Sequence, residues 1–201
     1  CGYYSNAGDE SHFLDNFSLV TFNGGSDQTV VIGTAPEYFY DLTINKPGGE
    51  VVLSGSIQIR YMLNLTQGIV LDTLVGVVQP LVTLEANATV VNTNHSSYVN
   101  GPVQKFGSAD FTFPVGEVNY YRPCRLEENT ATDLDAFTAE YFHTDPYTGH
   151  PFTPSTLDHL SHDEYWDIEQ SAGTPQARVI LSWYAPASGE VTPGQLDGLS
   201  V

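Results

Sequence analysis

The stretch YFYDLTINKPGGEVVLSGSIQIRYMLNL, residues 38–65, decides the expected fold. It carries spaced apolar pairs separated by Gly, Asn or Ser: Leu42/Ile44, Val51/Leu53, Ile57/Ile59 and Leu63/Leu65. Short apolar or β-branched runs between turn residues are typical of β-strands. The same half of the chain does not sustain the i, i+3, i+4, i+7 spacing of an amphipathic helix. We therefore expect an all-β fold.

The close succession of these strands favours a particular architecture. Short strands joined by tight turns are typical of a right-handed β-solenoid, in which each coil stacks its apolar side chains on the coil below. A β-sandwich made of hairpins is the competing interpretation, but the Asn-Gly and Asp-Gly dipeptides that favour tight hairpins are rare here. The pattern predicts a β-solenoid-like stem over residues 16–108, preceded by a polar, extended leader over residues 1–15.

The second half of the chain alternates apolar and polar residues over longer segments. Three such segments contain Phe111, Phe113 and Val115; Phe137, Ala139 and Tyr141; and Val179, Leu181 and Trp183. A strand with one buried and one wet face is what an antiparallel sandwich needs. We expect an antiparallel β-sandwich over residues 109–201, following the solenoid.

The chain is strongly acidic, with 6 Lys+Arg, 24 Asp+Glu and a formal net charge of -18 at pH 7. Such a charge repels nucleic acid and anionic lipid head groups, so neither is an expected partner. A hydrated surface and weak binding of Ca²⁺ through carboxylates are both compatible with this composition. No window approaches the roughly 18 consecutive apolar residues of a membrane span, so we expect no transmembrane segment.

The two cysteines, Cys1 and Cys124, leave three alternatives open. Cys1 followed by Gly2 and a polar stretch resembles the start of a mature bacterial lipoprotein, whose first cysteine carries the lipid anchor. Alternatively, Cys1 marks an arbitrary chain start, or it forms a disulfide with Cys124 in an oxidising compartment. Because the two cysteines lack CxxC spacing, they do not predict a structural metal site.

Signatures of catalysis are missing from the sequence. It contains no G-x-S-x-G nucleophile motif, no HExxH motif and no Gly-rich phosphate loop. Arg60 and Asp72 are the only charged residues between Val51 and Leu84, so the solenoid supplies no cluster of catalytic carboxylates. We expect no enzymatic activity and assign no catalytic residue.

A His-rich segment is the best candidate for metal binding. Its potential ligands are His143, Asp145, His150, Asp158, His159, His162 and Asp163. In so acidic a protein, oxygen-ligated Ca²⁺ is favoured over zinc. The Pro, Thr and Gly content is typical of a long surface loop, so solvated histidines are the default interpretation and no metal or cofactor site is assigned.

Two segments resemble a module of large secreted surface proteins of the Bacteroidota: YFYDLTINKPGGEVVL, residues 38–53, and SYVNGPVQKFGSADFTFPVG, residues 97–116. Those proteins carry phrases similar to F-x-N-L-T-I-N-K-x-x-G-x-V-x-L, S-Y-V-x-G-P-V-x-K and F-x-F-P-V-G. The resemblance spans roughly residues 17–185, although Asp41 stands where the family often has Asn. It implies a solenoid-like stem followed by a β-sandwich, export often by the type IX secretion pathway, and a role in adhesion, gliding or the extracellular matrix.

These observations together predict a structural or adhesive protein of the extracellular space or outer cell surface. We expect it to self-associate into an oligomer, filament or matrix, with the leader as a contact arm or as a tether from a lipidated Cys1. The alternative is a carbohydrate- or Ca²⁺-binding module of a larger exported protein, in which exposed Tyr residues stack on sugar rings. A glycan or another cell-surface molecule is therefore a further expected partner.

Overall fold

The computed structural model describes residues 4–6, 17–33, 35–72, 79–127, 129–146 and 161–182. These residues form strands and no helix, which confirms the expected all-β class. The strands are β1 (Tyr4–Asn6), β2 (Leu19–Phe22), β3 (Gln28–Ile32), β4 (Glu37–Asn45), β5 (Val51–Leu53), β6 (Ile57–Gln67), β7 (Val70–Asp72), β8 (Val82–Leu84), β9 (Thr89–Val91), β10 (Val99–Asn100), β11 (Val103–Phe106), β12 (Phe111–Phe113), β13 (Gly116–Glu117), β14 (Tyr120–Tyr121), β15 (Cys124–Glu127), β16 (Ala136–Phe142), β17 (Tyr165–Ala172) and β18 (Arg178–Leu181).

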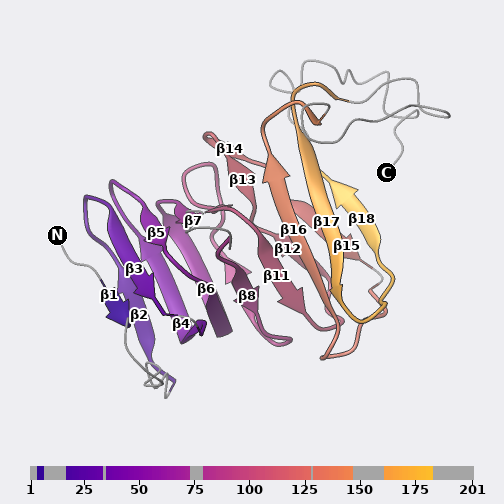
Figure 1. Cartoon of the computed structure of the whole chain (residues 1–201), viewed down its shortest axis with the longest axis horizontal. Helices are drawn as coiled ribbons and strands as arrows, with labels where there is room; N and C mark the ends of the chain where they lie inside the picture. Colours follow the sequence, from indigo (N-terminus) through magenta and orange to yellow (C-terminus); the bar gives the residue numbers. More distant parts are fainter. Residues whose placement is uncertain are drawn as a thin grey trace.

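Two parallel sheets form a solenoid-like arrangement of about 4 turns. One sheet has the strand order β1-β3-β5-β7-β10, and in the other β2, β4, β6, β8 and β11 follow one another. Because the first seven strands alternate between the two sheets, the chain crosses from one sheet to the other and returns one coil further along (Figure 1). The predicted β-solenoid-like region is therefore confirmed.

Apolar side chains of successive coils stack in fixed register. In one such ladder Val51 pairs with Val70, Val70 with Val99, and Val99 with Val115. All four valines are buried. Burial of each contributes about 1.5–3 kcal/mol, so ladders of this kind hold the coils together.

β6 pairs with two different strands along its length. Ile57–Ile59 pair with β8, whereas Met62–Asn64 pair with β9, so one strand serves two neighbours. Between these segments Arg60 and Tyr61 are both exposed, which interrupts the in-and-out alternation of a straight strand. The register between β4 and β6 also shifts at this place, between Phe39 and Asp41.

Buried lysines fasten neighbouring coils to each other. Lys105 Nζ donates hydrogen bonds to the backbone carbonyl oxygens of Glu85 (2.8 Å), Ala86 (2.7 Å) and Phe106 (2.8 Å). Lys46 Nζ donates to the backbone carbonyl oxygens of Gly24 and Ser26, in the turn between β2 and β3, and to the side-chain Oε1 of Gln28 at the start of β3. Lys105 is 4% exposed and Lys46 is 1% exposed. The Lys46 ammonium group thus bonds to the preceding coil, and that of Lys105 bonds to two carbonyl oxygens of the preceding coil and to one of its own strand.

The strand direction changes after β11. This strand pairs in parallel with β8 on one side and antiparallel with β16 on the other, and β16 pairs antiparallel with β17. A second antiparallel sheet, β12-β15-β18, contributes Phe113 and Leu126 to the buried core that also contains Phe137 and Ala139 of β16. The expected antiparallel strands are thus present, but the longer sheet continues from the solenoid across the predicted boundary at residues 108–109 (Figure 1).

Part of the predicted leader belongs to the solenoid itself. Tyr4–Asn6 form β1, which pairs in parallel with β3 of the same chain and places Tyr4 opposite Val30. Residues 1–3 and 7–15 of the leader lie outside the described residues. The use of the leader as a contact arm therefore stays a prediction for those residues.

The cysteine at the start of β15 is part of the core. Among the described residues Cys124 has no disulfide partner, and its side chain is 0% exposed. Burial raises the pKa of this thiol to about 12, so it stays protonated and unreactive near neutral pH. Cys1 lies outside the described residues, so its lipidation or its pairing with Cys124 stays a prediction.

Candidate functional site

The end of the sandwich between β17 and β18 is open and forms a groove with a volume of about 1040 Å³. β17 directs Trp166 and Ile168 into it, and β18 contributes Val179 and Leu181. These four side chains pack against the core but are only partly buried. The remaining lining residues are Phe137, Asp167, Glu169, Gln170, Gln176 and Ala177. A contiguous apolar surface with a polar rim is typical of a surface that binds another molecule.

Both walls of this groove are edge strands. β17 is the last strand of the eight-stranded sheet, and β18 is the last strand of the three-stranded sheet. Within the described part of the chain, each therefore has one side without a strand partner. β17 is 8 residues long, and an edge of this length is a template for pairing with a strand of another chain.

The opposite edge of the same sheet is β2, at the other end of the molecule (Figure 1). Leu19 of β2 is 59% exposed, and the preceding Phe17 is 80% exposed. The Phe17 ring meets Tyr40 edge-on with centroids 4.8 Å apart, and Tyr40 stacks on Tyr61 at 5.2 Å. Tyr40 is thus packed between two aromatic neighbours, and the exposed apolar area at this end comes mainly from Phe17 and Leu19.

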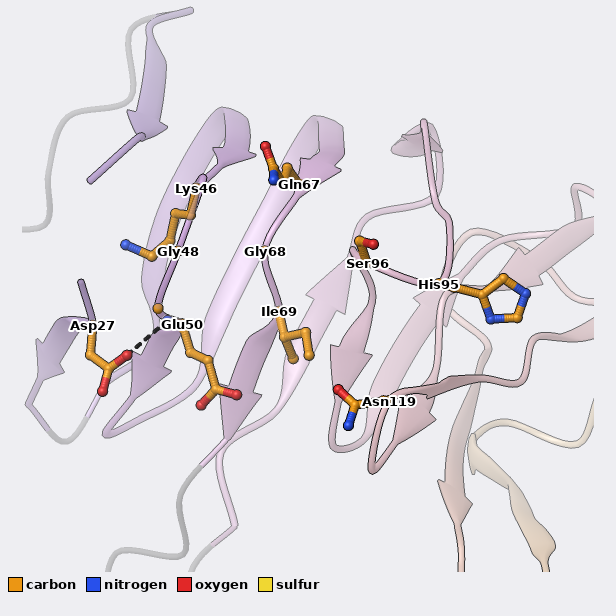
Figure 2. Close-up of a pocket in the computed structure, with 11 residues that line it drawn as sticks. Asp27, Lys46, Gly48, Glu50, Gln67, Gly68, Ile69, His95, Ser96 and Asn119 are labelled. Carbon is orange, nitrogen blue, oxygen red and sulfur yellow. Dashed lines mark hydrogen bonds between the residues drawn. The ribbon is translucent and has the colours of Figure 1, made fainter. Parts of the chain in front are cut away.

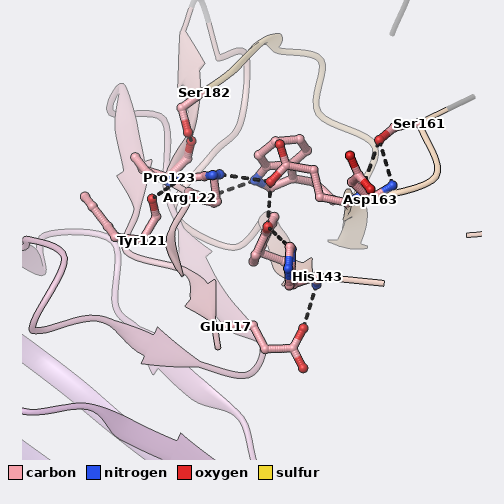
Figure 3. A network of polar contacts seen from close by, with 11 residues as sticks. Glu117, Tyr121, Arg122, Pro123, His143, Ser161, Asp163 and Ser182 are labelled. Carbon is pink, nitrogen blue, oxygen red and sulfur yellow. Dashed lines mark hydrogen bonds and ion pairs between the residues drawn. The ribbon is translucent and has the colours of Figure 1, made fainter. Parts of the chain in front are cut away.

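A network of polar contacts around Arg122 includes Trp166, one of the residues that line the groove (Figure 3). Arg122 Nε lies 2.9 Å from Glu164 Oε2, and the side chains are 2% and 5% exposed. Tyr141 donates its hydroxyl to the same oxygen at 2.5 Å, and Trp166 Nε1 donates to the Arg122 carbonyl oxygen at 2.9 Å. Burial, followed by the hydrogen bond to Glu164, raises the pKa of Tyr141, which therefore remains a donor. The network thus holds Trp166, which lines the groove, against the backbone between β14 and β15.

The His-rich segment does not assemble a metal site within the described residues. His162 Nδ1 lies 3.0 Å from Asp145 Oδ2, whereas the His143 backbone N–H donates to Glu117 Oε2 at 2.6 Å. The Asp163 backbone N–H donates to a neighbouring serine hydroxyl. Among the residues that the structure describes, no group of three or more His, Cys, Asp or Glu side chains could hold a metal ion. The other candidates, His150, Asp158 and His159, lie outside these residues.

A second groove, which is polar, crosses the turns of the first coils and has a volume of about 540 Å³ (Figure 2). Its lining residues are Asp27, Lys46, Gly48, Gly49, Glu50, Gln67, Gly68, Ile69, His95, Ser96 and Asn119. Asp27 Oδ1 accepts a hydrogen bond of 2.9 Å from the Glu50 backbone N–H, which joins two adjacent turns. Gly49 has φ +67°, and a Cβ there would approach the Asp27 backbone N to 2.4 Å, so the close stacking of these turns requires glycine.

No helix among the described residues is long and apolar enough to cross a membrane. Comparison of the chain with protein-family models, with curated proteins and with solved structures finds no match.

Proposed function

We propose that the protein is an extracellular structural or adhesive surface protein that associates end to end with further copies of itself. The observation that carries this proposal is the open end of the sandwich, where two edge strands flank a partly exposed apolar groove. The resemblance of residues 38–53 and 97–116 to secreted surface proteins supports a location outside the cell.

Each end of the molecule carries an edge strand and exposed apolar area, so the two ends suit each other as binding partners. β2 and β17 are opposite edges of one sheet, so a second copy placed end to end continues that sheet through a β2-to-β17 contact. Backbone hydrogen bonds along such an edge supply affinity, and alternating side chains supply register. Phe17 and Leu19 offer apolar area at one end, and the groove offers it at the other. Because the contact joins unlike surfaces, it produces an open filament unless the rotation closes a ring.

The charge of the chain opposes this contact at low ionic strength. A formal net charge of -18 makes two copies repel each other. The screening length falls from about 30 Å at 0.01 M salt to about 10 Å at 0.1 M. Association driven by edge pairing and apolar burial is therefore expected to strengthen as salt is added.

Sedimentation velocity over a range of protein and NaCl concentrations, together with electron microscopy, tests the proposal. Val179→Lys places a charge in the groove and is expected to abolish association. Ile180→Lys is the matched control, because Ile180 neighbours Val179 on β18 but lies outside the groove lining and is 42% exposed. We expect the control to associate as the wild type does.

Two outcomes would contradict the proposal. The first is a wild-type protein that remains a monomer at every protein and salt concentration. The second is equal association by the Val179→Lys and Ile180→Lys variants. Thermal melts of both variants separate a lost contact from a lost fold, and Leu19→Lys, at the other end of the sheet, is expected to weaken association in the same way.

The polar groove favours a second candidate function, that of a carbohydrate-binding module. Asp27, Glu50, Gln67 and Asn119 line the groove with carboxylate and amide groups, which bind the hydroxyl groups of sugars. A glycan array followed by titration calorimetry tests this function. Saturable binding that is weakened by Gln67→Ala would support it, and an array without hits would reject it.

A further inference from the structure

Three aromatic side chains follow one another along the outer side of the first three coils. The Phe17 ring meets Tyr40 edge-on at a centroid distance of 4.8 Å, and Tyr40 lies nearly parallel to Tyr61 at 5.2 Å, with 8° between the ring planes. These distances are close to the spacing of about 4.7–4.9 Å between neighbouring strands of a sheet. The row, which we call the aromatic ladder, therefore takes one ring from each successive coil: from the turn before β2, from β4 and from β6.

The aromatic ladder stops at Tyr61, although the coils continue. Met62 lies opposite Thr89 of β9, and the Thr89 hydroxyl donates to the Tyr61 carbonyl oxygen at 3.4 Å. The residues of the fourth coil beside Tyr61 are therefore Asn87, Ala88 and Thr89, and none of them has a ring. Ala88 is 3% exposed, so its methyl group is buried and does not take the place of a ring on the outer side.

One face of the Tyr61 ring is consequently open. Tyr61 is 52% exposed, although Tyr40 covers one of its two faces. Much of the opposite face must therefore be accessible, at the height where the fourth coil lacks a ring. Because the rings of the ladder follow one another at 4.8 and 5.2 Å, the open face leaves the next position of the ladder for the ring of a ligand.

Polar side chains border this open position. Asn87 and Thr89 are both exposed on the fourth coil. Arg60, which directly precedes Tyr61, lies 3.4 Å from the carboxylate of Glu85, and Glu85 is two residues before Asn87. An amide, a hydroxyl and a carboxylate thus surround the open ring face, and all three form hydrogen bonds with hydroxyl groups.

This combination indicates the class of ligand. A sugar ring offers an apolar C–H face that stacks on an aromatic ring, and its hydroxyl groups need hydrogen-bonding partners around that ring. The net charge of -18 disfavours an acidic sugar, and the guanidinium group of Arg60 beside Tyr61 disfavours a cationic ligand. A second copy is not the occupant, because β6 lies inside the sheet between β4 and β8, away from the edge strands β2 and β17.

We propose that the open face of Tyr61 is a stacking site for a neutral sugar ring, whose hydroxyl groups bond to Asn87, Thr89 and Glu85. The site rests on the second candidate function, carbohydrate binding, and gives it a place other than the polar groove, whose lining does not contain Tyr61. Tyr40 supports the Tyr61 ring from behind, so the ring is already ordered before a ligand arrives. Such preorganisation lowers the entropic cost of binding.

An array of neutral oligosaccharides of glucose, mannose, galactose and xylose, with oligogalacturonates as the acidic set, tests the site on the full chain. We expect saturable binding of at least one neutral oligosaccharide and none of the acidic set. Titration calorimetry with the best neutral oligosaccharide then compares variants. Tyr61→Ala is expected to weaken binding by about tenfold, the order of one aromatic stacking contact. Tyr61→Phe is expected to stay within about twofold of the wild type, because the ring and not the hydroxyl makes the contact.

Two further variants separate loss of the site from loss of the fold. Thr89→Trp places a ring in the open position of the ladder, so it is expected to block binding while Tyr61 itself is kept. Tyr165→Ala is the matched control, because Tyr165 also stacks on an aromatic neighbour, Phe142 at 4.7 Å, but on the distant strand β17. We expect this control to bind as the wild type does, and thermal melts to show that all variants are folded.

Several outcomes would overturn the site. Equal affinities of the Tyr61→Ala and Tyr165→Ala variants would do so, as would binding of the acidic set as strong as that of the neutral set. Binding that is lost in Gln67→Ala but unchanged in Tyr61→Ala would belong to the polar groove, so carbohydrate binding would stand and the Tyr61 site would fall. An array without hits would reject both the site and the second candidate function.

Discussion

The replacement of Lys105 by methionine is the most direct test of how the coils are held together. Met keeps most of the aliphatic volume but removes three hydrogen bonds, to the carbonyl oxygens of Glu85, Ala86 and Phe106. Each buried carbonyl left without a donor costs about 1–3 kcal/mol. Burial of the ammonium group is itself unfavourable, and it lowers the pKa of Lys105 to about 8. Removal of this charged group therefore offsets part of the loss of unfolding free energy. At the low end of about 1 kcal/mol per carbonyl, we expect Lys105→Met to lose about 3 kcal/mol of unfolding free energy.

Urea denaturation followed by circular dichroism measures this loss. Arg60→Met is the matched control, because Arg60 is 43% exposed and its ion pair with Glu85 spans 3.4 Å at the surface. An exposed ion pair contributes about 0–1 kcal/mol, so the control is expected to stay within that range. Lys46→Met removes an equivalent set of three hydrogen bonds in another coil and should resemble Lys105→Met. A loss below about 1 kcal/mol for both buried lysines would refute the reasoning.

Because Asp72 has a raised pKa in the folded protein, the melting temperature of the wild type should fall between about pH 5 and about pH 8, and Asp72→Asn should flatten that fall. In a Cys1→Ser background, Cys124 should react with a thiol reagent only after denaturation; a rapid reaction of the native protein would disprove its burial. Tyr141→Phe removes the hydroxyl that donates to buried Glu164 Oε2 and should cost about 1–3 kcal/mol in urea denaturation; a smaller loss would count against this contact. Melting temperatures should rise with NaCl as the charge of -18 is screened, and values independent of salt would count against self-repulsion.

The strands and their stacking could be predicted from the sequence because their signal is local. Spaced pairs such as Leu42/Ile44 mark the buried face of a strand, and the structure buries both residues of this pair. The register between coils is harder to predict from the sequence, since it depends on which distant strands pair with each other. Val82 lies opposite Val103 and Val51 opposite Val70, so each coil contains several of the short runs that the sequence shows.

The polar residues of the interior could not be found in the same way. Lys105 lies in register with Leu84, and Asp72 with Leu53, so a charged residue takes an inward position that the preceding coil fills with leucine. Local alternation alone does not separate such a residue from a solvated one, because its partners come from another coil. The ion pair of Arg122 with Glu164 also joins segments that are distant in the sequence, and neither residue has a local motif. An alignment of the coils by register is the signal that would have revealed the inward charges.

The inward polar groups distinguish one coil from the next, which the apolar ladders do not. The ladder of Val51, Val70, Val99 and Val115 repeats a single residue type, so a slip by one coil would still place valine on valine. The same slip would separate Lys105 from the carbonyl oxygens of Glu85 and Ala86 in the preceding coil, which accept two of its three hydrogen bonds. A buried charge without its partners costs about 3–5 kcal/mol, which exceeds the gain from any one apolar contact in the ladder. The apolar ladders thus hold the coils together, and the buried lysines select one register among several that the apolar contacts alone would allow.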